Sequence, residues 1–177
     1  LRNAELENVD ALGGLESVAS LEFGGNPRLR HLPEFTQLLR LDRLGISDND
    51  SLQNVPTLPK LLSDVIERGE YVGQPEATLI IYRPSSISIL YNASLTSITL
   101  SAGWFSAGHV GIWNNDALTR VEFTQQRSME QLVLINNASL ESVELGVLGT
   151  VDRLVFFGSA QLDSTVFDSV RTFETLF

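Results

Sequence analysis

The chain of 177 residues contains no cysteine and only two histidines. Without cysteine there are no disulfides, no thiol nucleophile and no cysteine-ligated zinc. His31 and His109 lie far apart along the chain, so we expect neither a bound metal nor a cofactor. No glycine-rich phosphate-binding loop is present, and no apolar run approaches the roughly 20 residues that a membrane-spanning helix needs.

Positive charge is also scarce. Lysine and arginine number 12 against 22 acidic residues, which gives a net charge of −10. Neither nucleic acid nor an anionic membrane surface is therefore an expected partner. The hydrophobic content of 43% and the length suit one folded domain over residues 1–177. The chain begins at Leu1 rather than at Met, so we expect a mature or excised fragment.

What the sequence does have is an internal repeat. Each unit reads N-x-x-L-x-x-V, then a short apolar run, a turn, and L-x-I-x-x-N. Successive units are 22 or 23 residues apart, except for one gap of 43. The repeated asparagines are Asn3, Asn26, Asn49, Asn92, Asn115 and Asn137, and Ser159 takes the next equivalent place. A repeat of this regularity indicates a solenoid.

The alternation of apolar and polar residues within each unit predicts short strands with one face inward. A period of about 22 residues is too short for a pair of helices and fits one coil of a parallel β-solenoid. We expect seven or eight coils, wound right-handed because parallel crossover connections almost always are.

Two segments depart from the template. After Pro59, apolar residues at helical spacing predict a short helix near residues 59–70, inside an irregular coil at about 59–86; a protruding loop is the alternative. In 163–177, a stripe of apolar residues spaced by four, three and four predicts a C-terminal cap helix, or the start of a further domain. The members of this stripe are Val166, Val170, Phe173 and Phe177.

The repeated asparagines are expected to form a buried ladder. A turn between parallel strands leaves backbone groups that neither strand can pair, and the Asn side chain offers donors and an acceptor to them. The predicted ladder contains Asn26, Asn49, Asn92, Asn115 and Asn137. Three of these open N-glycosylation motifs, at "NDS" and twice at "NAS", and burial argues against glycosylation there.

The stretches "LEFGGNPRLRHLPEF", "LGISDNDSLQNVPTL", "ISILYNASLTSITL" and "LVLINNASLESVEL" carry a family resemblance. They resemble receptor L-domains, the leucine-rich-repeat-like β-helices of growth-factor and insulin receptor ectodomains, over roughly residues 3–162. Animal members usually carry cysteines near the ends of the domain, so this chain is more similar to bacterial or fungal surface and secreted members. The resemblance implies an extracellular or cell-surface protein that binds or scaffolds.

The residues between the inward positions of the second run should face outward. In the C-terminal half these outward residues are apolar, which predicts a candidate binding face. The face consists of Leu90, Trp113, Val133, Ile135, Val155 and Phe157. It would bind a protein or glycan ligand, mediate homo-oligomerisation, or pack against the insertion or a downstream domain.

Three other motifs are weaker indications of function. Glu122 and Glu144 should lie on adjacent coils about 5 Å apart, near the carboxyl spacing of retaining glycosidases. The stretch "DNDSLQN" only begins like a calcium loop, and the aromatic-rich stretch Gly103–Trp113 would pack a loop or stack on a sugar or peptide. We therefore expect a non-enzymatic recognition or scaffolding domain. A structural spacer or wall protein and a carbohydrate-active enzyme are the alternatives.

Overall fold

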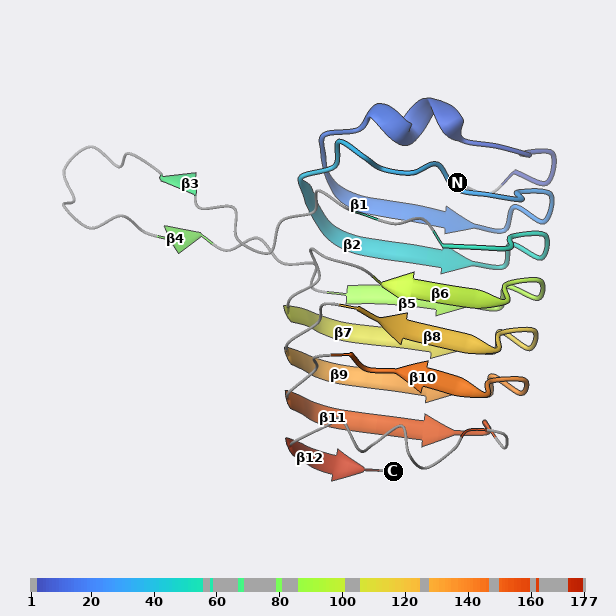
Figure 1. Ribbon diagram of the computed structural model, residues 1–177. Coiled ribbons are helices and arrows are strands. Elements are labelled where there is room, and N and C mark those ends of the chain that lie inside the picture. Colours follow the sequence, from blue (N-terminus) through green and yellow to red (C-terminus); the bar gives the residue numbers. More distant parts are fainter. Residues whose placement is uncertain are drawn as a thin grey trace.

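The computed structural model describes residues 3–55, 58, 67–68, 79–80, 86–100, 106–124, 128–146, 150–159, 162 and 172–176. These residues form an all-β parallel solenoid of about four turns. The only helix among them is a 3-10 turn, η1 (Asp10–Gly14), which lies beyond the first strand at the N-terminal end of the stack (Figure 1). In the part of the chain described, no helix has the length and apolar character needed to cross a membrane.

The larger sheet contains seven parallel strands in the order β1-β2-β5-β7-β9-β11-β12. Their bounds are β1 Ser17–Gly24, β2 Arg40–Ser47, β5 Ser86–Leu90, β7 Ser106–Trp113, β9 Ser128–Ile135, β11 Thr150–Phe157 and β12 Thr172–Leu176. The smaller sheet contains β6 Ser97–Leu100, β8 Arg120–Phe123 and β10 Ser142–Glu144. Its strands run the opposite way across the solenoid (Figure 1). Asn54 adds an isolated parallel bridge to Ser97, so pairing on both sides extends over about four turns.

The core lies between the two sheets and is filled from both. On the larger sheet the L-x-I positions stack in register, for example Leu44 on Ile87 and Ile46 on Ile89. On the smaller sheet Val121 and Phe123 have no exposed surface. The leucines three positions after each ladder asparagine are also fully buried: Leu29, Leu52, Leu95, Leu118 and Leu140. The sequence template therefore predicted the inward residues correctly.

The long strands bend partway along their length. In β1 the inward residues Val18 and Leu21 are three positions apart, although a straight strand would place them two or four apart. Their partners Leu41 and Leu44 in β2 have the same spacing. Figure 1 shows β1 and β2 curving near their N-terminal ends, so these strands wrap around a corner of the solenoid. The repeat template covered only the part of each strand after the bend.

The other corner contains the asparagine ladder, and all five predicted members have no exposed surface. The Oδ1 atom of Asn115 accepts hydrogen bonds from the backbone N (3.0 Å) and the Nδ2 (3.1 Å) of Asn92. The Nδ2 of Asn115 donates to the carbonyls of Ile89 (3.0 Å) and Trp113 (3.1 Å) and to Oδ1 of Asn137 (3.3 Å). One side chain thus satisfies groups on three coils.

The same corner closes with a tight turn. The backbone N of the template leucine donates to the carbonyl of the ladder residue three positions earlier, as from Leu118 to Asn115 at 3.0 Å. Ser159 keeps this turn with Leu162 at 3.2 Å, but its Oγ is buried without a partner in the described structure. Serine has the hydroxyl but not the reach of asparagine, so the ladder ends at Asn137.

The residue before each ladder position has a left-handed backbone. Asn114 (φ 55°) and Asn136 (φ 52°) take this conformation, which asparagine tolerates better than most residues. The paired asparagines of the sequence therefore divide two tasks: the first turns the chain and the second builds the ladder. The other members of the left-handed column are Gly25, Asp48, Tyr91 and Gly158.

Two expectations need correction. The cap helix is wrong at Thr172–Leu176, which form β12 and pair with β11; 163–171 lie outside the described residues. Phe173, the one member of the predicted stripe among the described residues, pairs with Val151 of β11. The helix near 59–70 is wrong at Glu67–Arg68, a strand (β3) that pairs antiparallel with β4 (Leu79–Ile80) outside both solenoid sheets. The rest of 59–85 lies outside the described residues.

Replacing a central ladder residue should destabilise the fold strongly. Asn115→Ala leaves the backbone N of Asn92 and the carbonyls of Ile89 and Trp113 without these partners, at about 1–3 kcal/mol for each buried group. We expect a loss of at least about 3 kcal/mol in urea unfolding. The matched control is Asn3→Ala at the exposed end of the ladder, which should cost less than about 1 kcal/mol. Equal losses in the two variants would contradict a stabilising role of burial in the ladder.

Tyr91 should be a strained position, because an aromatic residue occupies the left-handed column at φ 55°. Its side chain is 53% exposed, so little packing is lost on replacement. We expect Tyr91→Asn to raise the free energy of unfolding by about 1 kcal/mol, measured as an increase in Tm. Tyr91→Phe keeps the backbone strain and should leave Tm nearly unchanged. A lower Tm for Tyr91→Asn than for Tyr91→Phe would refute the strain argument.

Candidate functional site

The apolar residues expected to face outward form a continuous row on the larger sheet. Leu90, Trp113, Ile135 and Phe157 occupy the same register position on β5, β7, β9 and β11. Neighbouring strands lie about 4.8 Å apart, so their side chains are close enough to touch. Trp113 is 38% and Phe157 68% exposed, while Leu90 and Ile135 are half-buried. We call these four residues the apolar row.

The row continues toward the N-terminus with different chemistry. Ser47 of β2 lies next to Leu90, and Gly24 of β1 lies next to Ser47. This register position is therefore small or polar on the first two strands and apolar on the following four. This asymmetry distinguishes the two ends of a solenoid whose interior is nearly uniform.

A second outward row lies two residues earlier in each strand. It contains Ser88 on β5, Gly111 on β7, Val133 on β9 and Val155 on β11. Val133 faces outward yet is only 8% exposed, whereas Val155 is half-buried. A side chain on Gly111 would begin 3.3 Å from Nε1 of Trp113, so the indole leans over this glycine. We call this second row the floor row.

Above the floor row lies a hollow of about 270 Å³. Side chains that line it come from β5, β7 and β9 and include Ser86, Ser88, His109, Trp113, Gln131 and Val133. It forms because Ser88 and Gly111 are small, while Leu90, His109 and Trp113 beside them are large. Pockets that enclose a drug-sized molecule measure about 300–1,000 Å³, so this hollow suits a group that rests on the surface.

The side of the hollow opposite the apolar row is polar. Ser86, His109 and Gln131 are consecutive register partners on β5, β7 and β9. His109 places Nδ1 3.9 Å from a carboxylate oxygen of Glu130, and both side chains are more than half exposed. These three residues were not among the predicted site residues, because the predicted face included only the last four positions of each strand. Extending the register alignment by one residue toward the N-terminus would have included them.

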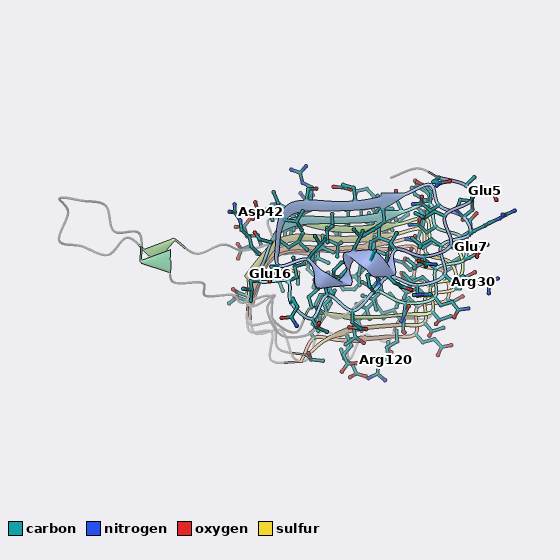
Figure 2. The ribbon with its side chains drawn as sticks, turned by 90° about the horizontal axis from the view of Figure 1, so that it is seen from above. Glu5, Glu7, Glu16, Arg30, Asp42 and Arg120 are labelled. Atoms are coloured by element: carbon teal, nitrogen blue, oxygen red, sulfur yellow. The ribbon has the colours of Figure 1, made fainter. Side chains whose placement is uncertain are left out.

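The two glutamates considered for catalysis lie on the smaller sheet. Glu122 and Glu144 are direct register partners on β8 and β10, as their spacing predicted. Arg120 lies between them and bonds both carboxylates, at 3.3 Å to Glu122 and 2.9 Å to Glu144. Figure 2 places Arg120 on the side of the solenoid opposite the long strands. The two glutamates therefore belong to a partly exposed network of two ion pairs that share Arg120. This network lies away from the apolar row.

No metal site emerges in the described part of the chain, where no three acidic or histidine side chains gather closely enough to hold an ion. Asp48, which begins the calcium-like stretch, belongs to the left-handed column of the corner. The first three residues of the aromatic-rich segment, 103–105, lie outside the described residues, and the rest of it forms β7.

The glycosylation motifs all begin with buried residues. Asn49, Asn92 and Asn137 have no exposed surface, and their Nδ2 atoms, to which a glycan would be attached, donate to backbone carbonyls of the preceding coil. The folded domain has no space for a glycan at these three positions.

Secretion of the domain from yeast, behind an added signal sequence, should therefore yield a folded fraction without N-glycans. Glycosidase treatment should leave its mass unchanged by mass spectrometry. The matched control is Glu5→Ser, which creates an acceptor motif at exposed Asn3 and should add one glycan to folded protein. A glycan on Asn49, Asn92 or Asn137 in the folded fraction would refute the expected exclusion.

Comparison of the chain with protein-family models, with curated proteins and with solved structures found no match.

Proposed function

We propose that this domain is a non-enzymatic recognition or scaffolding module that binds a protein or glycan partner through the outer face of its larger sheet. The observation that carries the proposal is the apolar row, four large apolar residues in register on four adjacent strands, with Trp113 38% and Phe157 68% exposed. A contiguous exposed apolar surface usually marks an interaction site.

The composition of the row supports a role in binding. Tryptophan and other aromatic residues supply much of the binding energy at interfaces, because they bury a large area with few rotatable bonds. Trp113 and Phe157 are two strands apart, so they provide two anchors on one surface. The backbone beneath them is a hydrogen-bonded sheet, which holds both anchors in fixed positions.

We also propose a handedness, a number of coils, a family resemblance and a location for this domain. We infer a right-handed solenoid of seven or eight coils, similar to receptor L-domains, because parallel crossovers are nearly always right-handed and the larger sheet has seven strands. An extracellular or cell-surface location follows from that resemblance. The ion pairs of Arg120 to Glu122 and Glu144 favour a structural role for these carboxylates and so support a non-enzymatic function.

The proposal predicts that binding depends on the apolar row. Wild-type protein and a Trp113→Ser/Phe157→Ser double variant are tested against a displayed peptide library and an oligosaccharide array. We expect the double variant to weaken selected interactions at least about tenfold, because both anchors are lost. The matched control is Leu39→Ser, which removes an apolar side chain that is 43% exposed but lies outside the row.

Equal weakening by Leu39→Ser and the double variant would show that binding depends on general surface hydrophobicity, and this would overturn the proposal. Absence of any selected ligand for the wild type would also overturn it. Sedimentation equilibrium tests self-association as the partner: a wild-type dimer that dissociates on Trp113→Asp would assign the row to contact between two copies of this chain.

A further inference from the structure

The geometry points to a binding site for a neutral saccharide in the hollow above Gly111, between the apolar row and the polar residues of β5, β7 and β9. The inference rests on the proposed recognition function, since it names a ligand class for the same face. The hollow is lined by the side chains of three adjacent strands and has a volume of about 270 Å³.

Three parallel rows define the site. One edge is the polar row of Ser86, His109 and Gln131, and the other edge is the part of the apolar row on the same strands. Between them runs the floor row, lowest at Gly111. Residues two apart along a strand are separated by about 6.6–6.8 Å, so the two edges lie about 13 Å apart at the backbone. The hollow therefore has one polar edge and one apolar edge.

The side-chain polar groups at the hollow make no hydrogen bonds within the described protein, and the one ion pair there joins His109 to Glu130. The side chains of Ser86, Ser88 and Gln131 make no hydrogen bond to other described residues, and neither does Nε1 of Trp113. Nδ1 of His109 lies 3.9 Å from Glu130, beyond hydrogen-bonding distance. On β1, by contrast, the outward Ser20 donates to Glu22 at 3.2 Å. Unpaired polar groups that converge on a concave surface are typical of a ligand site.

A sugar ring matches this arrangement. It has a face of C–H groups that packs on an aromatic ring and a rim of hydroxyls that donate and accept hydrogen bonds. The indole of Trp113 leans over the hollow and can pack against the C–H face of the sugar. Ser86, Ser88 and Gln131 can form hydrogen bonds with its hydroxyls. An apolar peptide side chain would use only the apolar edge and would leave desolvated polar groups unpaired, at about 1–3 kcal/mol each.

Charge favours a neutral sugar over an acidic one. Among the residues that the structure describes, no lysine or arginine lines the hollow, and Glu130 lies beside the histidine that does, His109. The chain as a whole carries a net charge of −10, which repels anionic polymers. The small volume suits one or two sugar rings that lie on the surface as part of a longer chain.

The test fills the hollow and leaves the apolar row intact. Gly111→Val places a β-branched side chain on the floor, where its Cβ would lie 3.3 Å from Nε1 of Trp113 and take up the space beneath the indole. Binding of short cello-, chito-, laminari- and manno-oligosaccharides is screened on an array and then titrated by calorimetry, with polygalacturonate as the anionic probe. Thr99→Val on the smaller sheet is the matched control, and circular dichroism verifies the fold of each variant.

We expect at least one neutral oligosaccharide to bind the wild type and Gly111→Val to weaken it at least about tenfold. Gln131→Leu, which removes polar partners without filling the floor, should also weaken binding. Thr99→Val and Phe157→Ser should change affinity by less than about twofold, because neither residue lines the hollow.

Failure of every neutral oligosaccharide to bind the wild type would overturn the inference, as would binding that Gly111→Val leaves unchanged. Tighter binding of polygalacturonate, or a selected peptide lost on Gly111→Val in the absence of saccharide binding, would show the wrong ligand class. Phe157→Ser separates the two proposals. If it weakens a selected partner while no saccharide binds, the recognition face stands and only the saccharide site falls.

Discussion

The hydrogen-bonded column of buried asparagines is the constraint on which the rest of this structure depends. At one corner of each coil the chain leaves one sheet and turns toward the other, so neither sheet can pair its backbone groups. Asn92 and Asn115 show the solution, in which each side chain accepts from the preceding coil and donates to its carbonyls. Because a coil without this residue would bury unpaired groups, the ladder holds the coils in register. It does so even across the gap of 43 residues, where the backbone N of Asn49 donates to Oδ1 of Asn92.

The corner restricts the sequence in a second way, besides requiring the ladder asparagine. The residue before each ladder position must adopt a left-handed backbone, and glycine, asparagine and aspartate do so at the lowest cost. Asn114–Asn115 and Asn136–Asn137 meet both conditions with one residue type, which explains the paired asparagines. Tyr91 is the exception, and its exposed ring shows that packing does not compensate for the backbone conformation.

The residues of the interior and the corners are fixed by packing and hydrogen bonding. The residue type can therefore vary mainly at the outward positions of the strands. Along one register position the outer face changes from Gly24 and Ser47 to Trp113 and Phe157, while the strands keep the same register. A row of large side chains next to small ones produces a hollow on a surface that would otherwise be flat. In this way a repeat that is nearly uniform inside acquires one distinctive site outside.

The sequence alone determined the repeat period, the inward residues, the ladder and the register of the apolar row. It could do so because each residue of a solenoid meets its equivalent in the next coil, so a local pattern is also a tertiary one. Only the tertiary structure decided that β12 is a strand, because the apolar spacing around Phe173 is typical of a helix and the pairing with β11 is a contact between two coils. It also decided that Arg120 binds two carboxylates and that the indole of Trp113 leans over Gly111. The orientations of such long side chains depend on neighbours from other coils and on the space these leave, which spacing along one chain does not specify.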